Sequence, residues 1–341
     1  MRFGLTLGVD VPPSPTALVE LVTEAEHLGF ASFWLGDHVV IPRVIDDAAH
    51  QLDVGGAVRI ADKTVVDIFE PVVTLAYLAG QVHTIRLGFN VLVIPYRNPV
   101  LTAKMLSSID VLCAGRLMLG AGVGWMEGEF TALGAAFARR GAVTDEYLQV
   151  MVQCWTEEHP SYHGRFYDLA DIAFRPNPQQ KPHVPIYIGG SGEPALRRAA
   201  QLGQGWLPLF QSPDELEPKL VRLTELCAQE HRDPRELTVI PSIRVRLRPE
   251  DDPHGVWSGS DPAAIRPLVA AYAELGVQEL TLVIVEPDLD VEMLHDRLRW
   301  WAAEVLVTHR PQRLASSPDG QLTTPGSSCT PTVLMKPAII R

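Results

Sequence analysis

An adjacent carboxylate and imidazole, Asp37 and His38, follow the apolar run 31–36, where a strand is expected to end. Histidine titrates near neutral pH, so its ring can donate or accept a proton during a reaction. In an α/β barrel the carboxyl ends of the strands carry the chemistry. We therefore select His38 and Asp37 as candidate catalytic residues. The alternative is an ordinary loop histidine beside a surface aspartate.

Two further polar residues are associated with the mainly apolar run 85–94. Asn90 lies within the run 85–94, and a buried amide requires hydrogen-bond partners. Arg97 comes next, in a turn bounded by Pro95 and Pro99. It could bind an anion, or it could occupy an ordinary surface turn, which the motif alone favours.

The first glycine-rich stretch has alternate glycines, Gly120, Gly122 and Gly124, after the run 116–119. Glycines allow a ligand or another backbone to approach closely. The spacing matches neither the dinucleotide-binding fingerprint nor a P-loop.

The second stretch, Gly189-Gly190-Ser191-Gly192, lies between an expected strand and an expected helix. Backbone N–H groups at a helix N-terminus form an anion site, so a phosphate would fit there. Ser191 is not expected to act as a nucleophile, because Glu193 stands where the nucleophile elbow requires glycine.

The elements that must position these residues alternate between strand and helix along the chain. Such alternation predicts a parallel sheet, and eight units favour a closed (β/α)8 TIM barrel with insertions in the βα loops over an open doubly wound sheet. Strands are expected at 2–7, 31–36, 85–94, 116–121, 186–188, 205–209, 237–245 and 279–285. Helices are expected at 16–28, 68–81, 99–109, 127–158, 193–202, 215–230, 262–275 and 291–305, with 162–182 irregular.

The chain of 341 residues is expected to form one barrel domain over 1–308, followed by a Pro/Ser/Thr-rich, disordered tail over 309–341. The net charge of −12 argues against nucleic-acid binding and against attachment to an anionic membrane. Neither a signal peptide nor a membrane-spanning run is found, and the four cysteines are scattered, so a cytoplasmic location is expected. No histidine spacing indicates a metal site.

Five stretches in chain order resemble the luciferase-like monooxygenase superfamily of flavin- and deazaflavin-dependent barrels. They are 24–30 (EAEHLGF), 33–38 (FWLGDH), 86–100 (from RLG to RNPV), 114–125 (from AGRL to GVGW) and 175–190 (RPNP with PIYIGG). The Asp-His pair and the Arg-Asn-Pro turn are most similar to the actinobacterial subgroup that uses coenzyme F420.

The resemblance implies a role for each candidate residue. His38 would lie beside the cofactor ring as proton donor or acceptor, oriented by Asp37, and a cis peptide between Asn90 and Val91 would bulge under the ring. The residues implied to line the cofactor edge are Gly122, Val123, Gly124 and Trp125. Those implied to cradle the phosphate are Gly189, Gly190, Ser191 and Gly192. A homodimer is also implied.

One departure from the family pattern concerns the substrate. F420-dependent sugar-phosphate dehydrogenases carry a glutamate after the third glycine, whereas this chain has Trp125 there, with Glu127 and Glu129 further on. That substrate class is therefore in doubt, and the 37–67 loop is expected to set specificity for a small organic substrate.

Two alternatives to an F420-dependent hydride transfer remain. One is an FMN-dependent monooxygenase supplied with reduced flavin by a partner reductase. The other is a non-catalytic flavin-binding barrel.

Overall fold

The computed structural model describes residues 1–7, 14–42, 68–246, 257–258, 262–284 and 291–306. The tail expected at 309–341, and the part of the specificity loop at 43–67, lie outside these residues. None of the helices in the described part is long and apolar enough to cross a membrane.

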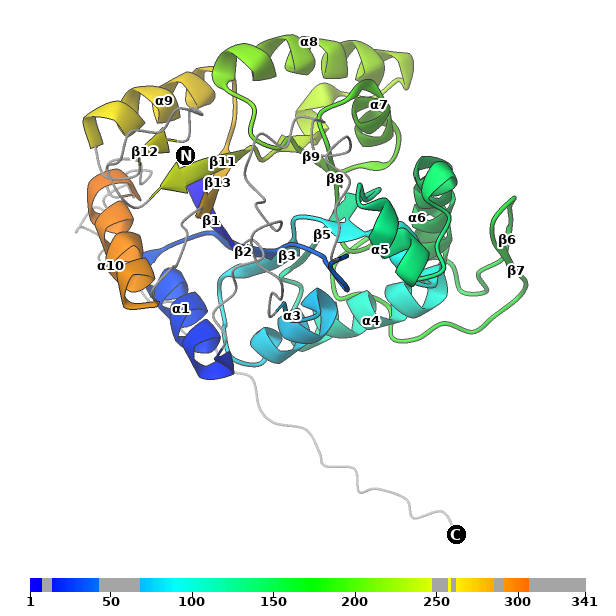
Figure 1. Ribbon diagram of the computed structural model, residues 1–341. Helices are drawn as coiled ribbons and strands as arrows, with labels where there is room; N and C mark the ends of the chain where they lie inside the picture. Colours follow the sequence, from blue (N-terminus) through cyan, green and yellow to red (C-terminus); the bar gives the residue numbers. More distant parts are fainter. Residues whose placement is uncertain (8–13, 43–67, 247–256, 259–261, 285–290, 307–341) are drawn as a thin grey trace, which may run out of the picture. The chain divides into compact units, whose positions relative to one another are not determined.

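Parallel strands form the inner layer of the fold (Figure 1). In chain order they are β1 (Arg2–Leu7), β2 (Ser32–Leu35), β3 (Arg86–Phe89) with β4 (Leu92–Val93), β5 (Leu117–Gly122), β8 (Ile186–Gly189), β9 (Gly205–Leu207), β10 (Thr238–Val239) with β11 (Ser242–Arg246), and β13 (Glu279–Ile284). Short β12 (Trp257–Ser258) pairs with β11, and the hairpin β6 (Tyr162–His163) and β7 (Asp168–Leu169) forms a separate two-stranded sheet.

The pairing closes the strands into a barrel. β1 lies between β2 and β13, and the order continues through β3, β5 and β8 to β9. The segment 238–246 joins the two ends, since β10 pairs with β9 and β11 pairs with β13. The predicted (β/α)8 barrel is therefore confirmed.

Helices surround the strands (Figure 1). They are α1 (Pro15–Leu28), α3 (Pro71–Ala79), α4 (Pro99–Leu112), α5 (Glu127–Ala132), α6 (Arg140–Thr156), α7 (Glu193–Leu202), α8 (Pro213–Gln229), α9 (Pro262–Glu274) and α10 (Val291–Trp301), the last continued by a π-helical turn, Ala302–Leu306. Local sequence explains their ends. Ser14 caps α1 through its side chain, and Gly29 ends that helix in the left-handed conformation.

Three expected elements are divided in the structure. The run 85–94 forms β3 and β4, separated at Asn90–Val91. The helical stretch 127–158 breaks at Gly134, whose φ of 69° does not continue a helix, and at the short 3₁₀ turn Phe137–Arg139. The strand expected at 237–245 divides at Pro241, where the chain passes from β9 to β13.

A buried polar cluster closes the end of the barrel where the strands begin. Glu279, at the start of β13, is completely buried. It accepts hydrogen bonds from Ser32 at 2.5 Å and from Arg86, which start β2 and β3. Trp34 donates its indole N–H to Ser32 at 2.7 Å. A carboxylate buried with a guanidinium and a hydroxyl has the partners that its desolvation requires.

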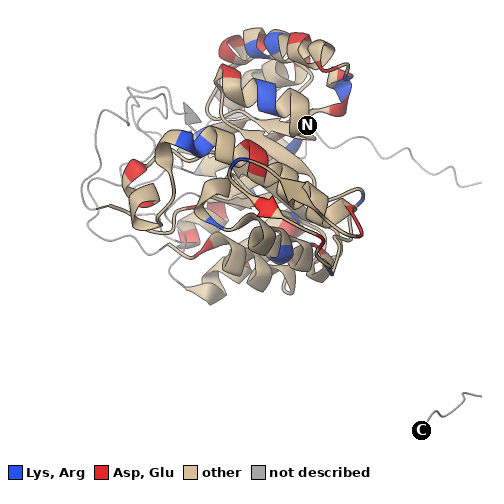
Figure 2. Ribbon diagram, turned by 90° about the vertical axis from the view of Figure 1, so that its right-hand side faces the viewer, with Lys and Arg blue, Asp and Glu red and all other residues tan. Residues whose placement is uncertain are grey.

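Charged side chains of both signs lie together on the outer helices. Figure 2 marks Lys and Arg in blue and Asp and Glu in red, and positions of both colours alternate along the helices at the top of the view, where α7 and α8 lie. Arg222 of α8 contacts Glu193 of α7 at 2.8 Å and Glu225 at 2.6 Å. Exposed pairs contribute only about 0.2–1 kcal/mol each. The fold is therefore held chiefly by its buried core.

One surface carboxylate predicts how stability depends on pH. Glu26 of α1 accepts hydrogen bonds from the backbone N–H groups of His83, Thr84 and Ile85. Partial burial alone would raise the pKa of Glu26, but these bonds lower it to about 2. A depressed folded-state pKa contributes stability above the ordinary pKa of about 4.5, and this contribution is lost as pH falls towards 2. We expect Glu26→Gln to melt below the wild type at pH 7, with the difference shrinking at pH 3. An equal difference at both pH values would contradict this assignment.

Candidate active site

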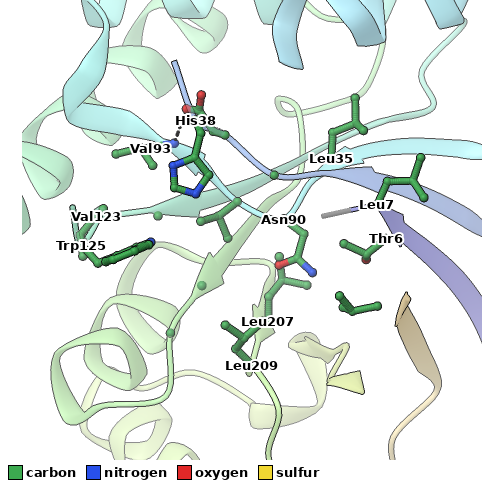
Figure 3. A pocket seen from close by; sticks show the side chains of 18 of the residues that line it. Thr6, Leu7, Leu35, His38, Asn90, Val93, Val123, Trp125, Leu207 and Leu209 are labelled. Atoms are coloured by element: carbon green, nitrogen blue, oxygen red, sulfur yellow. Dashed lines mark hydrogen bonds between the residues drawn. The ribbon is translucent and has the colours of Figure 1, made fainter. Parts of the chain in front are cut away.

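A cavity of about 320 Å³ opens at the carboxyl ends of the strands. Figure 3 shows His38 and Trp125 on one side of it, Leu7 and Thr6 on another, and Asn90 between them. Ten of the twelve predicted site residues line the cavity: Asp37, His38, Asn90, Val91, Gly122, Val123, Gly124, Trp125, Gly189 and Gly190. Ser191 and Gly192 are not part of this lining.

The contact that orients His38 is made by Glu129 of α5. Nδ1 of His38 lies 3.1 Å from Oε2 of Glu129, whose side chain is completely buried. Tyr96 donates its hydroxyl to the same oxygen at 2.8 Å. The other carboxylate oxygen, Oε1, accepts from the backbone N–H groups of Val39 at 2.5 Å and Val40 at 3.2 Å. Glu129 therefore holds both the imidazole and the backbone that follows it.

These contacts keep Glu129 ionised. Burial alone would raise the pKa of Glu129, but the hydrogen bonds from His38, Val39 and Tyr96 outweigh it and lower the pKa below its ordinary value. Burial and the negative charge of Glu129 raise the pKa of Tyr96, so its phenol stays protonated and donates. Because an ionised carboxylate only accepts, Nδ1 of His38 must carry a proton, which leaves Nε2 as the nitrogen that can exchange one.

Asp37 has a different role from the one predicted. The prediction that it orients His38 is wrong, because its carboxylate is directed to Arg97. The two side chains form a two-pronged ion pair with distances of 2.6 and 2.8 Å, and the backbone N–H of Val93 donates to Asp37 at 2.9 Å. Arg97 also binds Glu70, the N-cap of α3, at 2.6 Å. Asp37 therefore ties the loop after β2 to the turn before α4.

Arg97 is neither an open anion site nor a surface residue. Its side chain is 13% exposed, and its guanidinium is engaged by Asp37 and Glu70. Burial opposes its charge, yet the two carboxylates raise the pKa of Arg97 above its ordinary value. Arg97 therefore binds two carboxylates of the protein itself rather than an anionic ligand.

The Asn90–Val91 peptide is cis, as the resemblance implied. The Asn90 amide donates to Ser242 at 2.8 Å, and the Ser242 hydroxyl in turn contacts Thr281 at 2.9 Å. The side chain of Val91 lies against two glycines. A Cβ added to Gly122 would overlap its Cγ2, and one added to Gly189 would overlap its Cγ1. These glycines therefore make room for Val91.

Gly122→Ala tests this packing. Its methyl group would displace Val91 and the adjoining wall, and displacement by about an ångström can cost roughly a hundredfold in rate. We expect turnover and cofactor affinity to fall in Gly122→Ala and to recover in the double variant with Val91→Ala, measured as a double-mutant cycle. Equal losses in the single and double variants would show that Gly122 acts by another route.

The predicted phosphate cradle lies at the start of α7. Gly192 is the N-cap of this helix, and no side chain caps it. Ser191 accepts a weak hydrogen bond from the N–H of Leu209 at 3.4 Å. Gly189 and Gly190 line the cavity, so they connect it to the N-terminus of α7.

Glu129 and Tyr96 are the site residues that sequence reasoning missed. A glutamate five residues after Gly124, the last glycine of the glycine-rich stretch, gave a signal, but only the short helix α5 brings it to His38. Trp125, which directly follows Gly124, places its ring edge-on to the His38 ring, with the two ring centroids 6.0 Å apart. In the described residues, no group of three or more His, Cys, Asp or Glu side chains could hold a metal ion.

The family model for luciferase-like monooxygenases matches residues 1–279, and the chain therefore belongs to that family. Its members include oxidoreductases that use F420 and monooxygenases that use reduced FMN.

Three relatives illustrate this range. An uncharacterized protein of Mycobacterium tuberculosis is 30% identical over 282 residues, 82% of this chain and 90% of that protein. An F420-dependent glucose-6-phosphate dehydrogenase of Kineococcus radiotolerans is 28% identical over 198 residues, 57% of this chain and 52% of that enzyme. An FMNH₂-dependent dimethylsulfone monooxygenase of Pseudomonas putida is 34% identical over 108 residues, 31% of this chain and 30% of that enzyme.

The fold is also that of a solved structure, the F420-dependent tetrahydromethanopterin reductase of Methanopyrus kandleri. The TM-score is 0.70 at 16% identity, covering 90% of this chain and 99% of that one. The chain is thus an oxidoreductase of the luciferase-like family.

Proposed function

We propose that this oxidoreductase transfers a hydride between coenzyme F420 and a small organic substrate, while His38 supplies or removes the accompanying proton. The observation that carries the proposal is the contact between His38 and the buried, ionised Glu129 at the wall of the cavity. The F420-dependent relative from Kineococcus supports the choice of cofactor.

The residues present fit such a cofactor. The cavity wall is mainly hydrocarbon, and its volume of about 320 Å³ lies in the range of small-molecule sites. The uncapped N-terminus of α7 offers backbone N–H groups to a phosphate. The residues that would hold the ring are Asn90, Val91, Gly122, Val123, Gly124 and Trp125, and those that would hold the phosphate are Gly189, Gly190, Ser191 and Gly192.

When bound, the deazaflavin supplies a ring carbon that gives or takes a hydride. The chain itself handles the proton. In the reducing direction, Nε2 of His38 donates its proton to the substrate oxygen, while Nδ1 remains hydrogen-bonded to Glu129. In the oxidising direction, neutral Nε2 accepts the hydroxyl proton, and the carboxylate stabilises the imidazolium that forms.

A second function, an FMN-dependent monooxygenase supplied by a partner flavin reductase, is favoured by the Pseudomonas relative. An apolar cavity that excludes water would also suit that chemistry. The choice of cofactor distinguishes the two functions.

The test is a titration of the purified protein with F420 and, in a separate cell, with FMN, followed by fluorescence. We expect selective binding of the deazaflavin with a micromolar or lower dissociation constant. Selective FMN binding would replace the proposal with the monooxygenase. If neither cofactor binds, the proposal fails.

A further inference from the structure

We propose that the substrate is uncharged and apolar apart from its reacting group, and that Phe210 enforces this selectivity by covering the cationic side chain of Arg244. The inference rests on the proposed function, because it concerns the substrate of the same cavity.

The first argument is the character of the wall. Five strands contribute hydrocarbon side chains to it, namely those of Leu7, Leu35, Val93, Leu207 and Val283. Figure 3 shows Leu207 and Leu209 across the cavity from His38. A polar group placed against such a wall would lose its water without gaining a partner, which costs about 1–3 kcal/mol in proteins.

The second argument is that four polar side chains on the wall already have partners within the protein. Asp37 binds Arg97, Tyr96 binds Glu129, and Asn90 binds Ser242. The hydroxyl of Thr74 donates to the Glu70 carbonyl. The hydroxyl oxygen of Thr6 has no hydrogen-bond partner among the described residues, but it is buried and offers no accessible surface to a ligand. The Glu129 contact uses Nδ1 of His38 and leaves Nε2 available. We therefore expect Nε2 to be the polar atom of the wall that contacts the reacting group of the substrate.

The third argument concerns charge. Among the described residues, no lysine or arginine lines the cavity. Arg244 lies behind one of the lining residues, Phe210. On β11 it lies two residues beyond Ser242, whose hydroxyl points into the barrel, so Arg244 shares that face. Its side chain is buried, and its guanidinium carbon lies 3.9 Å from the centre of the Phe210 ring.

Phe210 itself lines the cavity and is fixed in position. Its N–H donates to the Ser242 carbonyl at 3.0 Å, and its φ of 54° places a bulky residue in the left-handed region. Such a conformation persists only where the surroundings hold it. We therefore infer that the Phe210 ring forms this part of the cavity wall and separates a bound substrate from the guanidinium of Arg244.

The test compares two ligands of nearly equal size, methyl 4-oxocyclohexanecarboxylate and 4-oxocyclohexanecarboxylate, at pH 7.5. Affinity is measured by calorimetry with the protein as purified and after addition of F420. We expect the neutral ester to bind at least tenfold more tightly than the anion. Equal or tighter binding of the anion, or binding of neither at millimolar concentration, would overturn the proposal.

Two variants test the role of Phe210. Phe210→Gly removes the ring and keeps a residue that accepts positive φ, so the fold is preserved. We expect the preference for the ester to fall several-fold in this variant and to stay unchanged in Leu209→Ala, which alters a neighbouring wall residue. An unchanged preference in Phe210→Gly would remove Phe210 from the inference. Ester-selective binding without hydride transfer would refute the proposed function and leave the substrate class standing.

Discussion

Replacement of His38 by alanine or asparagine is expected to abolish turnover while leaving cofactor affinity within a few-fold of the wild type. His38 lines the cavity, and its Nε2 is the proton-exchanging nitrogen that the Glu129 contact leaves available. Loss of a general acid or base costs about 10²–10⁴ in rate. The ring contributes less to binding, since many other residues line the cavity. Single-turnover kinetics and a cofactor titration separate the two effects.

His83→Ala is the matched control. This histidine is exposed in the loop before β3, where its backbone N–H, rather than its ring, contacts Glu26. Its removal should leave turnover unchanged. Undiminished turnover in His38→Ala would exclude His38 from proton transfer.

Glu129→Gln is expected to lower turnover nearly as much as His38→Ala, because of the way the Glu129 carboxylate is held. The N–H groups of Val39 and Val40 point at Oε1, so the glutamine oxygen must remain there. The new NH₂ group then takes the place of Oε2 and faces Nδ1 of His38. An amide N–H donates, so a neutral imidazole would carry its proton on Nε2, the wrong tautomer for a base. We expect turnover to fall by about 10²–10⁴, with the substrate KM within a few-fold.

The control for this variant is Glu127→Gln, the same change at an exposed position of the same helix. It should retain wild-type turnover and pH dependence. If Glu129→Gln kept normal turnover, or lost only thermal stability, then Glu129 would support the fold rather than position His38.

The barrel could be predicted from the sequence because its signals are local. Alternating apolar runs and helical periods mark the eight units, and Gly29 ends the first helix as its type suggests. Divisions inside elements were harder to predict. The run 85–94 is apolar apart from Arg86 at its start and Asn90, and periodicity alone does not show where such a strand breaks.

The candidate site was predicted in part. The residues at strand ends gather at one cavity, because parallel strands bring their carboxyl ends together. Partner choice was not predictable, since it depends on contacts between distant segments. Asp37 neighbours His38 in sequence but pairs with Arg97, 60 residues away, whereas His38 pairs with Glu129, 91 residues away.

The most direct test of the central claim follows the hydride itself. Reduced F420 carrying deuterium at both hydrogen positions of ring carbon 5 is mixed anaerobically with the protein and methyl 4-oxocyclohexanecarboxylate, and the product is analysed by mass spectrometry. The proposed chemistry predicts one deuterium on the carbinol carbon, formed by the wild type and lost in His38→Ala. A product without deuterium, or one formed only when oxygen and reduced FMN are supplied, would contradict hydride transfer from the deazaflavin.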